Sequence, residues 1–377
     1  MSNLFIGLMS GTSLDGIDAV LAAFDDAADT LAPRVLAHAS RDFPPTLRAE
    51  LLALNWSGSD EIHRCALAAN ALAREYAATI ATLLEKGGTD RAAITAIGCH
   101  GQTVRHRPRE FDGVGYTVQL NAPALLAELT GVDVVADFRS RDVAAGGQGA
   151  PLVPAFHRAV FARPATTAAV LNLGGIANLT VLGEDGATIG FDCGPANALL
   201  DLWCAASTGH AFDAAGAWAA SGTVDARLLH ALLDEPYFAL PPPKSTGRDL
   251  FHAEWLEARL LASDARRRLR PVDIQATLAE LTARACAQSL STHGADASEV
   301  IVCGGGAFNI DLMDRLRTAM RPVPVVSSDA RGLPPDQVEA SAFAWLARAF
   351  VRRVPGNIAT VTGAVGPRIL GALYPAR

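Results

Sequence analysis

Short apolar runs that end in glycine-rich turns are the most regular feature of the chain. The run from Leu4 to Met9 leads into a turn of glycine and hydroxyl residues, and a second apolar run, Ile17 to Phe24, follows it. Two apolar runs joined in this way are typical of a β-hairpin. The pattern returns about 160 residues later, where a Gly-Gly turn joins Ala168–Leu173 to Ile176–Leu182. The sequence therefore predicts two hairpins and a weak internal repeat.

Between and after the hairpins, helical and strand patterns alternate. Residues 60–87 have apolar positions at helical spacing and end at a Gly-Gly stop, and residues 94–99 form another apolar run. A helix from about 122 to 130 is predicted to precede a strand at 132–136. The run 300–303 ends in three glycines and leads into a further helical pattern. Strands and helices mixed along the whole chain predict the α/β class.

The length of 377 residues suits two domains better than one. Three prolines within residues 150–167 mark the predicted boundary. We therefore expect an N-terminal lobe at 1–160 and a C-terminal lobe at 161–377, whose last helices can pack back on the first lobe.

Composition and charge exclude several classes of protein. Half of the residues are apolar, 19% are charged, and a net charge of −7 comes from scattered acidic and basic residues. Nucleic acid is not an expected partner, since its binding usually needs a basic face. We find no signal peptide and no run of 18 apolar residues, so we expect no membrane span. Six widely spaced cysteines are typical of reduced thiols in a cytoplasmic protein.

The two common nucleotide-binding fingerprints are missing. Gly11 and Gly16 have P-loop spacing, but Ile17 stands where the lysine belongs, and the triple glycine at 304–306 lacks the last glycine of GxGxxG. Glycine-rich turns can nevertheless aim backbone N–H groups at a phosphate. Either the three turns simply join strands, or they hold a phosphorylated ligand. Hydroxyls and carboxylates beside the first turn favour the second interpretation.

The order hairpin, hairpin, Gly-Gly-Gly and helix resembles the actin/sugar-kinase/Hsp70 ATPase superfamily. This resemblance implies a two-lobed fold with a central cleft for ATP and substrate, in which the two hairpins hold the phosphates and the third glycine element lies against the adenosine. It implies Mg²⁺ as well. Asp15 and Asp18 beside the first turn could hold a divalent cation, and Asp18 is the expected metal ligand. The implied ATP contacts are Gly11, Thr12, Ser13, Leu14, Asp15, Gly16, Ile17, Asp18, Asn172, Gly174, Gly175, Gly304, Gly305 and Gly306.

Longer strings resemble one family in particular, the anhydro-N-acetylmuramic acid kinases of bacterial cell-wall recycling. The resemblance extends from residue 5 to about 375. It rests on GLMSGTSLDGID at 7–18, CHGQT at 99–103, ADFR at 136–139, RDVAAGGQGAPLVP at 141–154, NLGGIAN at 172–178, FDCGP at 191–195, KSTGR at 244–248 and CGGGAFN at 303–309.

The family resemblance implies a double reaction. Water opens the internal glycosidic bond of 1,6-anhydro-N-acetylmuramic acid while the 6-oxygen takes the γ-phosphoryl group of ATP, giving N-acetylmuramic acid 6-phosphate. One carboxylate is needed to accept the proton of the water. The phosphoryl group replaces the acid that a glycosidase would supply to the leaving oxygen.

Asp192 is the carboxylate that the resemblance assigns to this role. Its position shortly before Pro195 leaves two interpretations open on the residue pattern alone. Asp192 is either a catalytic base or the cap of a helix that begins near Pro195. With the family resemblance we expect the base.

Five further residues are candidates for contacts with the sugar. Arg141 and Arg139 could pair with the lactyl carboxylate or form a salt bridge. His100 and Gln102 could donate hydrogen bonds to sugar hydroxyls or to the acetamido group, or they could have a purely structural role. Glu339, which precedes a helix predicted at 340–347, could face the sugar or the helix N-terminus.

Two other functions remain open at this point. One is an ordinary sugar kinase, in which Asp192 deprotonates a free hydroxyl. The other is an actin- or Hsp70-like ATPase with a protein partner. The family resemblance also implies a homodimer, which no residue pattern shows.

Overall fold

The structure is a computed structural model and describes residues 3–11, 14, 16–25, 32–247 and 250–377. The chain divides into two compact units, each described here by itself. Unit 1 comprises Met1–Val160 and Gln337–Arg377, and unit 2 comprises Phe161–Asp336. A lobe boundary near residue 160 was expected, with the last helices able to pack back on the first lobe, and residues 337–377 belong to unit 1.

Unit 1 is built around a six-stranded sheet with the order β13-β7-β4-β1-β2-β3. The predicted first hairpin is confirmed, since β1 pairs with β2 in antiparallel fashion, and β4 and β7 continue the sheet in parallel. The strands are β1 Leu4–Met9, β2 Gly16–Ala23, β3 Arg34–Asp42, β4 Ile94–Cys99, β7 Val134–Ala136 and β13 Ala372–Tyr374.

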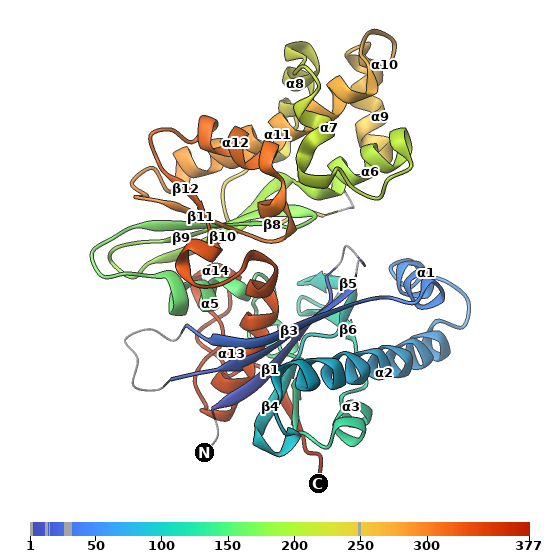
Figure 1. The fold of residues 1–377 in the computed structure, drawn as a ribbon, viewed down its shortest axis with the longest axis vertical. Helices are drawn as coiled ribbons and strands as arrows, with labels where there is room; N and C mark the ends of the chain where they lie inside the picture. The colour runs from blue at the N-terminus through green and yellow to red at the C-terminus, as the bar shows by residue number, and fades with distance from the viewer. Residues whose placement is uncertain (1–2, 12–13, 15, 26–31, 248–249) are drawn as a thin grey trace. The chain divides into compact units, whose positions relative to one another are not determined.

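Two long helices cover opposite faces of this sheet (Figure 1). Residues of α2, Glu61–Gly87, join Ile6, Leu8 and Leu21 in one core cluster. The other face meets α13, Val338–Val351, where Gly7 and Gly98 lie directly against the helix backbone. The alternation of side chains along β1 produces this division, because successive residues point to opposite faces.

The remaining elements of unit 1 are shorter. A two-stranded ribbon of β5 and β6 stands apart from the main sheet. The elements are α1 Pro45–Ala53, η1 Arg91–Ala93, β5 Gln102–Pro108, β6 Gly115–Leu120, α3 Pro123–Thr130, α4 Ser140–Ala144, α5 Val153–Phe161 and α14 Ala359–Thr362.

Unit 2 has a five-stranded sheet with the order β10-β9-β8-β11-β12. The second predicted hairpin is confirmed as β8 and β9, and β11 and β12 extend the sheet in parallel. The strands are β8 Ala168–Leu173, β9 Ile176–Leu182, β10 Thr188–Pro195, β11 Val300–Cys303 and β12 Val325–Ser327.

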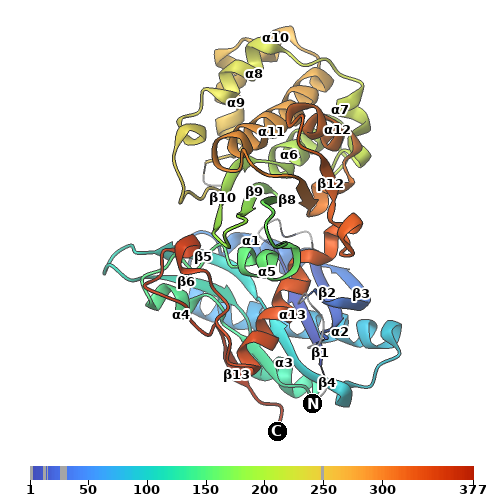
Figure 2. The same cartoon turned by 90° about the vertical axis from the view of Figure 1, so that its left-hand side faces the viewer.

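Helix α11, Pro271–His293, packs on β9 and β10 and contacts α12 (Figure 2). Leu171, Phe191 and Leu278 are buried in the core between them. The other elements are α6 Asn197–Thr208, η2 Ala214–Gly216, α7 Ala217–Ala220, α8 Ala226–Leu233, η3 Pro236–Ala239, α9 Ala253–Ala262, α10 Ala265–Arg268, η4 Gly305–Phe308, α12 Ile310–Ala319, η5 Ser328–Arg331 and η6 Pro335–Gln337.

The internal repeat is a repeat of topology. In each unit, three successive antiparallel strands are followed by two parallel strands added beside the first. The order β3-β2-β1-β4-β7 in unit 1 thus corresponds to β10-β9-β8-β11-β12 in unit 2. The expected α/β class is confirmed.

Some boundaries differ from those expected. The strand predicted from residue 132 begins at Val134, the helix predicted near Pro195 begins at Asn197, and Glu339 lies inside the first turn of α13. Five of the six cysteines are buried, and all six are free thiols. Among the described residues, no helix is both long and apolar enough to cross a membrane.

The contact between α13 and the sheet depends on glycine in β4. A Cβ added at Gly98 would overlap the carbonyl oxygen of Phe343. We therefore expect Gly98→Ala to destabilise unit 1 by about 1–3 kcal/mol, because α13 must move outward. Urea unfolding followed by circular dichroism measures the change. Gly366→Ala is the control, since its added Cβ would meet only the Arg368 side chain, at 3.5 Å. Equal losses for both variants would contradict the prediction.

Candidate active site

The first glycine-rich turn connects β1 to β2, and only part of it lies within the described residues. Thr12, Ser13 and Asp15 fall outside them. The Gly11 carbonyl accepts hydrogen bonds from the N–H of Leu14, at 3.2 Å, and from the Gln102 amide, at 3.0 Å. The side chains of Leu14 and Ile17 are buried in the core of unit 1. If these two residues contact ATP, they can do so only through their backbone.

Asp18 is the predicted metal ligand. It lies in β2, with its Oδ1 atom 3.3 Å from Nε2 of His38 in the neighbouring strand. Among the described residues, no group of three or more His, Cys, Asp or Glu side chains is arranged to hold a metal. A single carboxylate still suits Mg²⁺, which usually keeps several waters and takes phosphate oxygens as its other ligands.

His100 and Arg139 form a buried pair in unit 1. Nε and Nη2 of Arg139 donate to Nε2 of His100 at 3.1 and 2.9 Å, and Nη1 donates to the Gly149 carbonyl at 2.7 Å. Burial and the Arg139 charge hold the pKa of His100 well below its usual range. The imidazole is therefore neutral and carries its proton on Nδ1, since Nε2 accepts. Nδ1 is buried and makes no hydrogen bond of normal geometry within the described residues, although backbone groups of Gly101 and Ser10 lie near the ring and act to raise its pKa.

Gln102 lies beside this pair in the sequence and is also buried. Its amide nitrogen holds the Gly11 carbonyl, while its Oε1 atom has no partner within the described ranges. Ser10 is bonded to Tyr76, with 2.7 Å between the hydroxyl oxygens, and donates to the Gly101 carbonyl at 3.3 Å. The residues from 99 to 103 are thus tied to the first turn and leave two polar atoms unpaired.

The other two predicted sugar contacts, Glu339 and Arg141, differ in their surroundings. Burial lowers the pKa of Arg139 to about 10, and the nearby carboxylates of Glu339 and Asp142 act against this effect. Glu339 therefore belongs to the same neighbourhood as Arg139. Arg141, in contrast, is exposed on α4.

Asp142 fixes the loop that follows Arg139. Its buried carboxylate accepts hydrogen bonds from the N–H of Gly149 at 2.8 Å, from the Asn357 amide at 2.6 Å and from the Thr362 hydroxyl at 2.7 Å. Segments 139–149 and 357–362 are far apart in the sequence, and this carboxylate joins them. The loop that carries Arg139 is therefore rigidly placed within unit 1.

In unit 2 the second and third glycine elements meet. Cys303 pairs with Asn172 across β11 and β8, so Gly304–Gly306 follow directly beside the end of β8. A Cβ on Gly304 would overlap the Asn172 side chain, and one on Gly306 would meet the Leu173 Cβ at 2.6 Å. The carbonyl of Gly174 accepts the N–H of Asn197 at 3.0 Å. The structure thus brings together the residues predicted for ATP in this unit, Asn172, Gly174, Gly175, Gly304, Gly305 and Gly306.

Asp192 lies in β10, the edge strand of the sheet, and does not cap a helix. The N-cap of α6 is Ala196, without a side-chain hydrogen bond. Oδ2 of Asp192 accepts the N–H of Thr246 at 3.0 Å. Burial raises the pKa of Asp192 to about 7, although the Thr246 N–H and the charge of Lys244 act to lower it. A carboxyl group with a pKa near 7 can take up and release a proton at neutral pH.

Asn178 is a candidate that sequence reasoning missed. Asp192 pairs with Asn178 and Asn178 with Asn172, so the three side chains form a row on one face of the sheet. Asn178 is partly exposed. The signal in the sequence was a second asparagine on the return strand, opposite Asn172, but only the register of the hairpin reveals the pairing.

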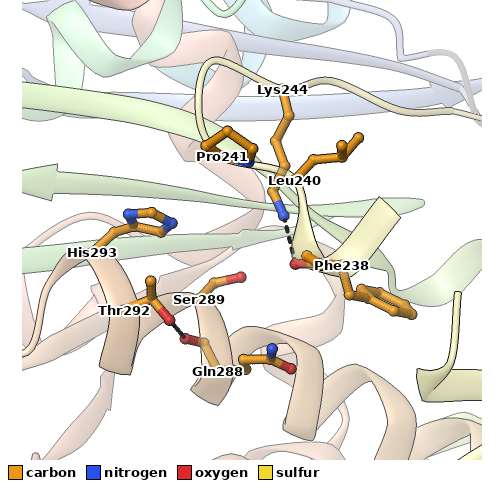
Figure 3. A pocket seen from close by; sticks show the side chains of 9 residues that line it. Phe238, Leu240, Pro241, Lys244, Gln288, Ser289, Thr292 and His293 are labelled. Atoms are coloured by element: carbon orange, nitrogen blue, oxygen red, sulfur yellow. Dashed lines mark hydrogen bonds between the residues drawn. The ribbon is translucent and has the colours of Figure 1, made fainter. Parts of the chain in front are cut away.

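A pocket of about 350 Å³ lies behind β10, between the C-terminal end of α11 and the segment 238–244 (Figure 3). Lys244 and His293 face it together with Ser289. The His293 ring packs edge-on against Phe191, with 4.9 Å between centroids. Because neighbouring side chains of a strand alternate, the pocket lies on the Phe191 side and the Asp192 carboxylate on the other.

Comparison with known proteins gives one consistent result. Residues 3–376 match the family model for anhydro-N-acetylmuramic acid kinase. Curated relatives with that name include proteins from Albidiferax ferrireducens, 58% identical over all of both chains, and Variovorax paradoxus, 59% identical over 99% of each. A relative in Bordetella petrii is 60% identical over 99% of this chain and 96% of its own.

The raised pKa of Asp192 has a consequence for stability. The folded protein binds this proton up to about pH 7, whereas an unfolded aspartate releases it near pH 3.9. The free energy of unfolding therefore falls as the pH rises from about 4 toward 7, because the folded protein must then hold an ionised carboxylate that is partly buried. We expect Asp192→Asn to stabilise the protein by about 1–4 kcal/mol at pH 8 and by less at pH 5.

Thermal unfolding at the two pH values measures this difference. Asp329→Asn removes an exposed carboxylate from the same unit and is the matched control, with little expected effect at either pH. An Asp192→Asn effect that is the same at pH 5 and pH 8 would contradict the burial of a titrating carboxylate.

Proposed function

This chain belongs to the anhydro-N-acetylmuramic acid kinase family, and we propose that it couples two reactions on one sugar. The enzyme uses ATP and water to open 1,6-anhydro-N-acetylmuramic acid and to phosphorylate its 6-oxygen. The product is N-acetylmuramic acid 6-phosphate, which returns peptidoglycan fragments to metabolism. We further propose that it acts in the cytoplasm, as a homodimer.

The chemistry balances around a single base. Water attacks the anomeric carbon and gives its proton to Asp192. The bond between that carbon and the 6-oxygen breaks, and the electron pair stays on the oxygen. This oxygen attacks the γ-phosphorus of ATP, and ADP leaves. No separate acid is required, because the phosphoryl group captures the charge that develops on the 6-oxygen.

The environment of Asp192 is the observation that carries this proposal. Its pKa of about 7 makes it a stronger base than an exposed aspartate, yet leaves much of it ionised at neutral pH. The Thr246 N–H binds Oδ2 and fixes the orientation of the carboxylate. Asn178, its neighbour on the same sheet face, is suited to hold the attacking water through its amide.

For the phosphates we propose the glycine-rich turns. Gly174, Gly175 and Gly305 leave room for close approach by a ligand, whereas glycine at 304 and 306 lets the ends of β8 and β11 meet. The first turn offers backbone groups around Gly11. Asp18 would hold Mg²⁺, and the ion would neutralise phosphate charge when bound. Glycine has no Cβ atom, which is the physical reason why it recurs at these turns.

For the sugar we propose the pair of His100 and Arg139. Arg139 fixes the His100 tautomer, so that Nδ1 donates a hydrogen bond to a sugar oxygen. The unpaired Oε1 of Gln102 accepts one from a hydroxyl or from the acetamido N–H. Glu339 lies in the same neighbourhood, and the exposed Arg141 is suited to the lactyl carboxylate.

A product assay tests the proposal directly. The enzyme is incubated with ATP and 1,6-anhydro-N-acetylmuramic acid, and products are identified by mass spectrometry. We expect a product that has gained one phosphoryl group and one water. We expect Asp192→Asn to lower the rate at least 10²-fold while ATP binding, measured by calorimetry, is retained. A product that gained only the phosphoryl group, or near-normal turnover by Asp192→Asn, would overturn the proposal.

A further inference from the structure

We propose that the segment from Tyr237 to Thr246 is a strap that positions Asp192, and that Lys244 is its positioning residue. This inference rests on the proposed role of Asp192 as the base. The strap lies along the open edge of β10, where a strand has no neighbour to hold it. Lys244 and Thr246 belong to the KSTGR string at 244–248, which the sequence alone left without an assigned role.

Three hydrogen bonds join the strap to one residue. The N–H of Asp192 donates to the Lys244 carbonyl at 3.1 Å, and the Tyr237 hydroxyl donates to the Asp192 carbonyl at 2.8 Å. The third is the bond from the Thr246 N–H to Oδ2. Both backbone polar groups of Asp192 and one carboxylate oxygen are therefore bound by a segment about 50 residues further along the chain.

The Lys244 side chain connects the end of the strap to its beginning. Its ammonium donates to the carbonyl of Tyr237 at 3.3 Å and to that of Phe238 at 3.1 Å, and Figure 3 shows the second bond. The ammonium also lies 4.9 Å from the centre of the Tyr237 ring and 5.8 Å from that of Phe191. Lys244 thus joins the first residues of the strap to the last and to the side chain beside Asp192.

The start of the strap is anchored separately. Glu235, just before Tyr237, accepts hydrogen bonds from Trp255 at 2.8 Å and from Arg259 at 2.9 Å. The Tyr237 and Phe238 rings both pack against Phe251. Loss of the Lys244 ammonium should therefore loosen the end of the strap near Asp192 without releasing its start.

Lys244 also supplies a charge to this region. The titratable groups nearby are Cys193 and Asp192 on β10 and His293 on α11, and the charge of Lys244 affects the pKa of both Asp192 and His293. The thiol of Cys193 is hydrogen-bonded to that of Cys286 on α11, and this hydrogen bond and burial raise the pKa of Cys286 well above its usual value. Since burial and Lys244 lower the pKa of His293, the neighbouring imidazole favours its neutral form. Lys244 is therefore the cation that favours the ionised, basic form of Asp192.

The pocket behind β10 makes this role testable. Lys244 faces that pocket and not a closed core, so a change of side chain there opens no new cavity among packed residues. Lys244→Met keeps the length of the side chain and removes the charge, whereas Lys244→Arg keeps the charge. Tyr237→Phe removes one strap bond without changing any charge, and serves as the matched control.

The experiment measures the pKa of Asp192 directly. Protein labelled with ¹³C at the aspartate carboxyls is titrated by NMR, and Asp192→Asn identifies the signal by its absence. We expect Lys244→Met to raise the pKa of Asp192 by about one unit. Lys244→Arg keeps the charge, so the pKa of Asp192 should stay close to its wild-type value. Tyr237→Phe should also leave this pKa within a few tenths of the wild-type value.

Kinetics give the second measurement. In Lys244→Met the acid limb of kcat/KM for the sugar should move to higher pH by the same amount, and kcat should fall about tenfold with KM for ATP unchanged. An unchanged Asp192 pKa in Lys244→Met would overturn the inference. If the pKa shifts but the wild-type profile has no such acid limb, the role of the strap stands and the base assignment fails, so the two failures are distinguishable.

Discussion

A carboxylate kept partly buried at the edge of a sheet is the constraint on which the site in unit 2 depends. Asp192 loses much of its hydration, and among the described contacts its side chain receives only one hydrogen bond, the N–H of Thr246. The unfavourable desolvation raises its pKa to about 7. A more completely bonded carboxylate, such as Asp142 with three donors, serves as a structural tie. The difference in hydrogen bonding separates the proposed base, Asp192, from the structural carboxylate of Asp142.

Backbone geometry explains why glycine recurs at so many positions in and around the proposed site. Each unit repeats three antiparallel strands followed by two parallel ones, and the glycine turns follow the ends of β1, β8 and β11. In unit 1 the close approach of α13 to β1 and β4 requires glycine at 7 and 98. In unit 2 the meeting of β8 and β11 requires it at 304 and 306. The absence of a Cβ thus serves close packing at all four positions.

Much of the architecture could be predicted from local sequence. Both hairpins, the long helix to Gly87 and the strand before the three glycines follow from apolar spacing and glycine stops, which are local signals. The pairing of Asn178 with Asp192, the burial of Leu14 and Ile17 and the strap along β10 could not be predicted. These features depend on strand register and on contacts between residues tens of positions apart. The resemblance of long strings supplied the candidate base, since the residue pattern alone left a helix cap equally open.

The position of the water oxygen in the product is the most direct test of the proposed role of Asp192. Enzyme, ATP and 1,6-anhydro-N-acetylmuramic acid are incubated briefly in water labelled with oxygen-18, and fragments of the sugar phosphate are weighed by mass spectrometry. Preformed product in labelled water corrects for spontaneous exchange at the anomeric carbon. Activation of water by Asp192 predicts one labelled oxygen at the anomeric carbon and none in the phosphoryl group. Label in the phosphoryl group, or none at the anomeric carbon above the correction, would contradict it.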